Sequence, residues 1–213
     1  KAGIVPVAGN TLWTTRDYEY MLRDSRARAL VVSASLLPAF APLFGTLPDL
    51  KHVIVSGAPA GGLAAGQHAF APLLAAAGTD FAPAGTTCDD VCFWLYSSGS
   101  TGAPKGTVHT QSSLICTAEL YARPILGIRE DDVVFSAAKL FFAYGLGNGL
   151  TFPMAVGATA VLMAERPTPA AVFARLVKHQ PTIFYGVPTL FVALLASPDL
   201  PARGALRMRR CTS

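Results

Sequence analysis

The sequence predicts an α/β fold in which most strands run parallel. Apolar runs with strand character alternate with amphipathic helical segments, the pattern expected when helices connect parallel strands. The chain has 213 residues, of which 52% are hydrophobic and only 14% are charged, against about 25% charged in average domains. A chain of this length and composition can bury a large core and form one or two domains.

The first half of the chain contains one well-marked helix and three strands. Thr14 stands three residues before Asp17, which predicts a capping box at a helix start. The apolar positions of this helix are Tyr18, Met21 and Leu22. A shorter helix over residues 68–77 should be interrupted by Pro72. Buried strands are expected at residues 29–32, 52–55 and 91–96.

Proline residues mark helix boundaries in the second half. A helix from residue 112 should end at Arg123, because Pro124 does not fit a helix interior. Thr168 as N-cap and Pro169 as first helical residue predict another helix. Its apolar face is expected to comprise Val172, Phe173, Leu176 and Val177. The remaining elements are strands at 133–136, 158–163, 182–185 and 206–211 and a helix at 190–196.

Residues 140–164 carry no charge and are long enough to cross a bilayer, which takes about 20 residues. Several glycines, Asn148 and Pro153 interrupt this stretch. They favour a buried helix, a turn at Gly157 and a strand. We therefore expect a folded core segment and no membrane partner, and a membrane hairpin remains a distant alternative.

Charge and cysteine content indicate which binding partners and which cellular compartment to expect. The net charge is +4, without a long run of Lys or Arg, so no nucleic-acid partner is expected. The four cysteines show no paired CxxC spacing, which disfavours a zinc site. No signal peptide is visible, so we expect a cytoplasmic protein with reduced thiols. The oligomeric state stays open, and an oligomer is possible.

The most informative stretch is residues 96–106, Tyr-Ser-Ser-Gly-Ser-Thr-Gly-Ala-Pro-Lys-Gly. Its glycines let the backbone approach a ligand, and its N–H and hydroxyl groups can surround an anion. Lys105 adds a mobile positive charge. This is no Walker A loop, because Pro104 precedes Lys105 and Gly106 follows it. A plain Gly/Ser linker is disfavoured by the hydrophobic strand, including Trp94, that leads into the loop.

Residues 96–106 resemble the phosphate loop of the acyl-adenylate-forming, AMP-binding enzymes. The resemblance implies stacked, mostly parallel mixed sheets sandwiched by helices, with ATP, Mg²⁺ and CoA as cofactors or co-substrates. It implies catalytic roles for Lys105, which would neutralise the leaving pyrophosphate, and for Thr101, which would lie near Mg²⁺ as a metal-binding residue. The residues implied to bind the ATP phosphates are Ser97, Ser98, Gly99, Ser100, Thr101, Gly102 and Lys105.

A second stretch, residues 139–149, indicates the substrate. It starts Lys-Leu-Phe-Phe-Ala-Tyr-Gly-Leu-Gly-Asn, and its aromatic residues form either core or a flat apolar slot for a ring. The stretch resembles the acyl-pocket segment of benzoate–CoA ligases and their hydroxybenzoate relatives. The resemblance implies a small aromatic carboxylate as substrate, activated with ATP to an acyl-adenylate and then to a CoA thioester. The implied substrate-binding residues are Phe142, Ala143, Tyr144, Gly145, Val187 and Pro188.

The resemblance covers nearly all of residues 1–213 but only part of the family's length. These residues would form a partial N-terminal AMP-binding domain, with the family's adenine-contacting Gly-Glu turn and its small C-terminal domain missing. We therefore expect the chain alone to be inactive. Two other functions remain open: another acyl-CoA ligase or carrier-loading adenylation domain, and a non-catalytic nucleotide-binding fragment. The ring substituents of the substrate also stay open.

Overall fold

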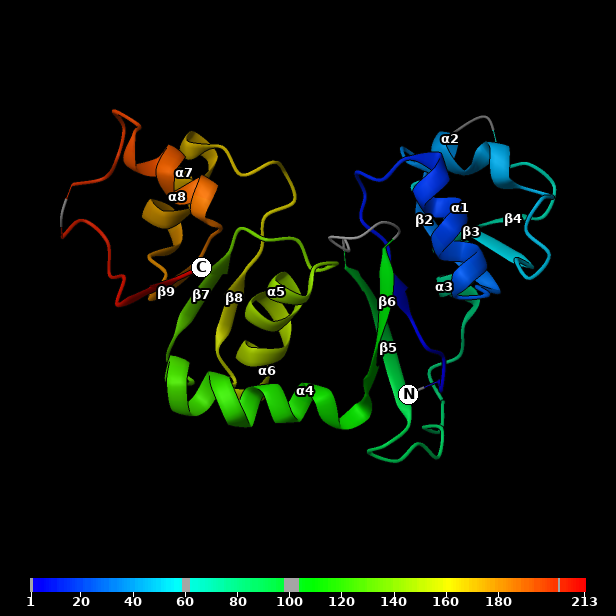
Figure 1. Ribbon diagram of the computed structural model, residues 1–213, viewed down its shortest axis with the longest axis horizontal. Helices are drawn as coiled ribbons and strands as arrows, with labels where there is room; N and C mark the ends of the chain where they lie inside the picture. The colour runs from blue at the N-terminus through cyan, green and yellow to red at the C-terminus, as the bar shows by residue number, and fades with distance from the viewer. Residues whose placement is uncertain (1, 59–61, 98–103, 203) are drawn as a thin grey trace. The chain divides into compact units, whose positions relative to one another are not determined.

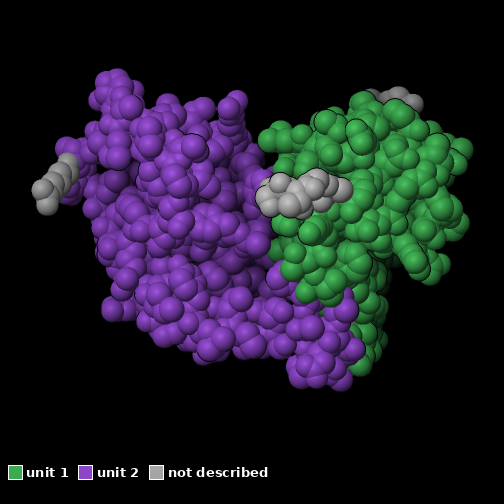
Figure 2. All heavy atoms as spheres, in the orientation of Figure 1, with its two compact units in different colours: residues 1–86, 92–108 green, residues 87–91, 109–213 purple. Residues whose placement is uncertain are grey.

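The computed structural model describes residues 2–58, 62–97, 104–202 and 204–213. The chain divides into two compact units, shown in green and purple in Figure 2. Unit 1 comprises residues 1–86 and 92–108, and unit 2 comprises residues 87–91 and 109–213. Every strand pairing whose register is resolved is parallel. The predicted α/β class with mostly parallel sheets is therefore confirmed.

Unit 1 holds two three-stranded sheets, with the strand orders β1-β5-β6 and β2-β3-β4. Its elements in chain order (Figure 1) are β1 (Val7–Ala8), α1 (Thr15–Asp24), β2 (Ala29–Ser33), α2 (Leu37–Phe40), η1 (Ala41–Leu43), β3 (His52–Ser56), β4 (Gln67–Ala69), α3 (Phe70–Ala76), β5 (Val91–Ser97) and β6 (Lys105–Thr110).

The core of unit 1 lies between α1, α2 and one face of the β2-β3-β4 sheet. Alternate residues of a strand point to opposite faces, and in β2 Leu30 and Val32 are buried whereas Val31 is 60% exposed. The predicted capping box is present, with Asp17 N–H donating to Thr14 Oγ1 and Thr14 N–H donating to the Asp17 carboxylate. This cap fixes the start of α1, which buries its predicted apolar face in the core.

Unit 2 is built on one four-stranded sheet with the strand order β10-β9-β7-β8. Its elements in chain order (Figure 1) are α4 (Gln111–Thr117), η2 (Ala118–Leu126), β7 (Val133–Ser136), α5 (Ala143–Leu146), η3 (Gly147–Thr151), α6 (Phe152–Val156), β8 (Thr159–Val161), α7 (Pro169–His179), β9 (Ile183–Tyr185), α8 (Pro188–Leu195) and β10 (Arg210–Thr212).

Helices cover both faces of the unit 2 sheet. Phe135 of β7 and Phe184 of β9 pack in one cluster with the buried residues of α7 and α8. Their neighbours Val134, Ile183 and Tyr185 pack in a second cluster with η2 and α6. The alternation of side chains along β7 and β9 thus builds two cores, one on each face. Within this unit the sheet is sandwiched by helices, as the resemblance implied.

Two helix predictions that depended on proline were wrong. The helix expected to end before Pro124 continues through it as the π-helical stretch η2, whose C-cap is Gly127 with φ of 63°. The wider π turn accommodates a residue that lacks an N–H donor. Pro72 does not interrupt α3, because it is the third residue of that helix, where the N–H needs no intrahelical partner. Residues 67–69 form β4 instead of helix.

Two further details differ from expectation. Val177 of α7 is 56% exposed, because it lies about 100° around the helix from the buried Leu176. The last strand is confined to Arg210–Thr212. It pairs in register with the three residues of β9, so the length of its partner limits the ladder.

The uncharged residues 140–164 fold into α5, η3, α6 and β8, with the chain turning at Gly157 (φ 82°). This order agrees with the expected helix, turn and strand. In the described part of the chain, no helix combines the length and the apolar character needed to cross a membrane.

Candidate active site

The structure describes the two ends of the predicted phosphate loop. Ser97 is the last residue of β5 and Lys105 is the first residue of β6, and these strands are neighbours in their sheet. Both side chains are exposed. The other predicted phosphate-binding residues lie outside the described residues, namely Ser98, Gly99, Ser100, Thr101 and Gly102. The ATP and metal roles assigned to the loop therefore stay predictions.

Tyr96 is the first residue of the stretch 96–106, but it was not predicted as a phosphate-binding or catalytic residue. It is buried, and its hydroxyl donates a hydrogen bond of 2.5 Å to Asp24 Oδ2. Burial raises the pKa of Tyr96, and the hydrogen bond to Asp24 acts in the same direction, so the hydroxyl is a donor at neutral pH. No local pattern could reveal this contact, because the two residues are 72 positions apart.

The predicted acyl-pocket segment, residues 139–149, runs through α5 into η3. Phe142 is the N-cap of this helix, and its carbonyl accepts from Leu146 N–H at 2.8 Å. The Phe142 side chain is 46% exposed and tilts against Phe141, with ring centroids 4.5 Å apart. Ala143, the first residue of α5, is also exposed. The segment thus presents an accessible aromatic surface.

Gly145 lies in α5 where no side chain fits. A Cβ atom there would lie 2.1 Å from the carbonyl oxygen of Lys139 and 2.6 Å from its carbonyl carbon. The helix therefore packs directly on the backbone that precedes it. Gly145 therefore has a packing role, because its missing side chain allows this close approach. The sequence had predicted it only as a substrate-binding residue.

Lys139 ties the beginning of this segment to the chain after β8. Its Nζ donates to the carbonyl oxygens of Met163, Ala164 and Glu165 at 2.5, 2.9 and 2.7 Å. Burial lowers the pKa of Lys139, and the nearby Glu165 carboxylate partly opposes this shift. All three donors of an ammonium group are used here. Lys139 therefore has a structural role. Its position in the sequence, as a charged residue directly before a long uncharged stretch, could have suggested this role.

Tyr144 joins the segment to the edge of the sheet. Its hydroxyl lies 2.9 Å from Thr212 O and 3.2 Å from Gly186 O, both carbonyl acceptors, and 3.3 Å from Thr212 Oγ1. Gly186 precedes Val187 and Pro188, both exposed. The structure thus brings the Tyr144 hydroxyl close to the backbone just before the predicted substrate-binding residues Val187 and Pro188. Its hydroxyl is engaged by the protein, so its ring is the part available for a ligand.

β10, which carries Thr212, is held by a cluster around Asp132. The carboxylate is buried and accepts hydrogen bonds from Arg209 through both Nε (3.0 Å) and Nη2, from Thr182 Oγ1 (2.6 Å) and from Arg129 N–H (2.8 Å). Burial alone would raise the pKa of Asp132, but the bonds from Arg209, Thr182 and the Arg129 backbone outweigh it, so the pKa is lowered.

Two tyrosines in this unit allow a matched test of hydroxyl pairing. Tyr185 is fully buried, and among the described residues nothing pairs with its hydroxyl. An unpaired buried polar group costs about 1–3 kcal/mol. We expect Tyr185→Phe to leave the free energy of unfolding unchanged or raise it by about 1 kcal/mol. Tyr144→Phe removes paired bonds and should lower it by about 1 kcal/mol. Urea unfolding measures both, and a loss in Tyr185→Phe would contradict the assignment.

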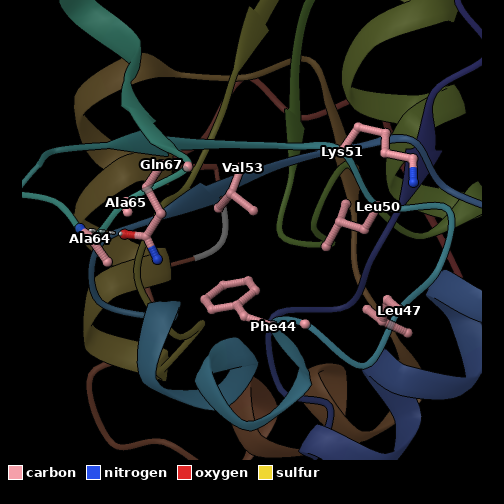
Figure 3. A pocket seen from close by; sticks show the side chains of 10 residues that line it. Phe44, Leu47, Leu50, Lys51, Val53, Ala64, Ala65 and Gln67 are labelled. Carbon is pink, nitrogen blue, oxygen red and sulfur yellow. Dashed lines mark hydrogen bonds between the residues drawn. The ribbon is translucent and has the colours of Figure 1, made fainter.

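A pocket of about 240 Å³ lies in unit 1 and contains none of the predicted site residues. Figure 3 shows Phe44, Leu47 and Val53 among its side chains, with Gln67 Oε1 accepting from Ala64 N–H at 3.4 Å. Lys51 is the one ionisable side chain in the described lining, and its Nζ donates to Pro48 O at 2.6 Å. The side chains of this pocket offer no convergent catalytic groups.

The fold, the loop signature and the acyl-pocket segment define a class of protein: the chain belongs to the AMP-binding enzyme family, which it matches over residues 1–212. Within this class it is 68% identical to the benzoate–CoA ligase of Thauera aromatica over all 213 residues. It is 51% identical to the 4-hydroxybenzoate–CoA/benzoate–CoA ligase of Rhodopseudomonas palustris. The chain spans 39% of the length of each of these relatives.

Solved structures agree with this assignment. The benzoate–CoA ligase of Burkholderia xenovorans LB400 superposes with a TM-score of 0.85 at 55% identity, over 98% of this chain and 40% of that one. The anthranilate–CoA ligase AuaEII, in complex with anthranoyl-AMP, gives a TM-score of 0.90 at 38% identity, over 97% of this chain and 40% of that one. The resemblance read from the loop is thereby confirmed.

Proposed function

We propose that the chain is part of a ligase that activates an aromatic carboxylate of the benzoate type. ATP and the carboxylate would give an acyl-adenylate and pyrophosphate, and the thiol of CoA would then displace AMP to form a thioester. The single observation that best supports an aromatic substrate is the accessible ring of Phe142, which is 46% exposed at the start of α5. The similarity to aryl–CoA ligases supports the same reaction.

In the first step a carboxylate oxygen attacks the α-phosphorus, and the bond to the pyrophosphate oxygen breaks. Ser97, Ser98, Gly99, Ser100 and Gly102 would hold the phosphates with N–H and hydroxyl donors. Thr101 would supply a hydroxyl oxygen to Mg²⁺, the type of ligand that this ion prefers. Bound Mg²⁺ would neutralise phosphate charge. Lys105 is exposed at the start of β6, and its ammonium would stabilise the charge that develops on the pyrophosphate.

The substrate ring would lie against residues 142–145 and 187–188. Phe142 would pack on the ring edge to face or offset, the arrangements that aromatic pairs favour. The Tyr144 hydroxyl is bonded to Thr212 and Gly186, so Tyr144 would contribute ring contact rather than a hydrogen bond. Gly145 would contribute by letting α5 approach the backbone at Lys139. Val187 and Pro188 would line the inner end of the pocket.

Replacing Lys105 by alanine tests the first step. Carboxylate-dependent exchange of pyrophosphate into ATP by the native protein that contains this chain should fall about 100-fold, the loss typical of one electrostatic group at a developing charge. Lys178→Ala removes an exposed lysine near the end of α7 and should leave the exchange unchanged. Equal activity of the Lys105→Ala protein and the wild type would remove Lys105 from the mechanism.

Replacing Phe142 by leucine tests the substrate class. The KM for benzoate should rise about two- to tenfold, because ring–ring contact worth about 0.5–1.5 kcal/mol is lost, while the KM for ATP should stay the same. Phe70→Leu is the matched control, since Phe70 is 40% exposed on α3 of unit 1. An unchanged KM for benzoate would mean that Phe142 does not contact the substrate.

The proposed reaction also implies a cellular location and a metabolic role for the protein. We expect the protein to act in the cytoplasm, where ATP and CoA are available, in the breakdown of aromatic compounds. The main alternative is a related ligase or carrier-loading adenylation domain for alkyl or hydroxycinnamic acids. A surface walled by Phe142 and Tyr144 favours a short planar acid over a long alkyl chain, and a substrate panel separates these choices.

A further inference from the structure

The side chain of Tyr96 connects the strand that enters the predicted loop to helix α1. Tyr96 lies one residue before Ser97, and its hydroxyl bonds to Asp24, the last residue of α1, at 2.5 Å. Hydrogen bonds from a hydroxyl to a carboxylate are short and about twice as strong as those between neutral groups. The ring is held edge-on by Trp13 and Tyr20, with centroids 6.2 and 6.5 Å away. Its position is thus well defined.

The same ring also rests on the strand that leaves the loop. Gly106 follows Lys105 in β6, and a Cβ atom there would lie 3.0 Å from Tyr96 Cζ and 3.2 Å from its hydroxyl oxygen. A Cβ at Gly106 would also lie 3.0 Å from Cε3 of Trp94. A side chain at this position would force these rings to shift by a few tenths of an ångström, so glycine favours the close contact. Tyr96 therefore belongs to β5, the strand that ends at Ser97, and contacts β6, the strand that begins at Lys105.

Asp24 is an unusual residue for its place in α1. A carboxylate at the C-terminal end of a helix faces the negative end of the helix dipole, which is unfavourable. The bond from Tyr96 offsets this cost. Helix α1 is itself fixed by its capping box and by the burial of Tyr18, Met21 and Leu22. A rigid helix therefore reaches the base of the loop through one hydrogen bond.

We propose that Tyr96 is a positioning residue for nucleotide binding, which holds Ser97 and Lys105 at a fixed spacing through its bond to Asp24 and its contact with Gly106. The ligand concerned is the polyphosphate of ATP, so this inference rests on the proposed function. Tyr96 acts through its neighbours and does not itself touch the nucleotide.

Tyr96→Phe in the native protein tests this role, with the dissociation constant for ATP measured by titration calorimetry. Loss of one hydrogen bond to a carboxylate should raise this constant about tenfold. The KM for benzoate in the exchange reaction should not change. Asp24→Ala should weaken ATP binding to a similar degree, and the double variant should bind no more weakly than either single variant, because all three lack the same bond.

Tyr18→Phe is the matched control. It removes another buried tyrosine hydroxyl from unit 1, one that donates to Asn10 O at 2.8 Å, and it should lower the melting temperature without changing ATP affinity. If Tyr96→Phe binds ATP like the wild type, the positioning role is overturned and the proposed function stands. If Tyr18→Phe weakens ATP binding equally, the effect is general destabilisation and the role is also overturned. A wild-type protein that binds no ATP overturns both.

Discussion

Replacing Asp132 by alanine is expected to lower the free energy of unfolding by about 3 kcal/mol. Removing one partner of a buried ion pair costs about 3–5 kcal/mol, and the low end applies because the Arg209 side chain is 30% exposed. The variant also leaves Thr182 Oγ1 and Arg129 N–H without the carboxylate they donate to. Urea denaturation of the native protein, followed by a probe of unit 2, measures the change.

The neighbouring Asp131 provides the control. It is exposed, so Asp131→Ala should change the free energy of unfolding by no more than about 0.5 kcal/mol. Similar losses in the Asp131→Ala and Asp132→Ala proteins would show that the cluster around Asp132 is not the source of the stability.

Because the pKa of Asp132 is lowered in the folded state, the contribution of Asp132 to the stability of the fold should depend on pH. A carboxyl group whose pKa is lower in the folded state stabilises the fold above its unfolded pKa of about 3.9. This stabilisation is lost as the pH falls from there through the lower pKa of the folded state. The gap in stability between wild type and Asp132→Ala should therefore be constant near neutral pH and narrow below about pH 4.

Replacing Gly145 by alanine is expected to disrupt the acyl-pocket segment. The added Cβ would lie 2.1 Å from Lys139 O, and the obstacle is backbone, which cannot rotate away as a side chain can. Overpacking costs about 1–3 kcal/mol and more where nothing can give, so we expect a loss of about 3 kcal/mol. The KM for benzoate should rise more than the KM for ATP, because the displaced helix carries Ala143 and Tyr144.

Gly78→Ala is the control for this substitution. Gly78 has open space around its position and no positive φ, so alanine there should be neutral. Thermal unfolding and exchange kinetics of both variants give the comparison. A Gly145→Ala protein with wild-type stability and wild-type KM for benzoate would contradict the close packing of α5 on Lys139.

Local patterns predicted much of the fold. The capping box at Thr14 and Asp17, and the N-cap at Thr168 with Pro169, depend only on nearby residues, and both are present. The errors at Pro72 and Pro124 arose because the effect of proline depends on its position in the helix and on the width of the turn. Neither can be read from the residue type alone.

Residues of the candidate site could be proposed from the sequence only where they are contiguous in the chain. The segment around Phe142 and the loop flanks could be named from the sequence. The contacts that hold them could not, because Tyr144 meets Thr212 across 68 positions and Arg209 meets Asp132 across 77. Such pairs leave no periodic signal, and tertiary packing brings them together.

Carboxylate-dependent exchange of labelled pyrophosphate into ATP by the native protein tests the proposed reaction most simply. The exchange reports acyl-adenylate formation alone, before CoA is involved. We expect exchange with benzoate to exceed exchange with octanoate by at least about tenfold, since a pocket walled by aromatic rings discriminates by shape. A preference for octanoate, or no exchange with any aromatic acid, would contradict the proposed reaction.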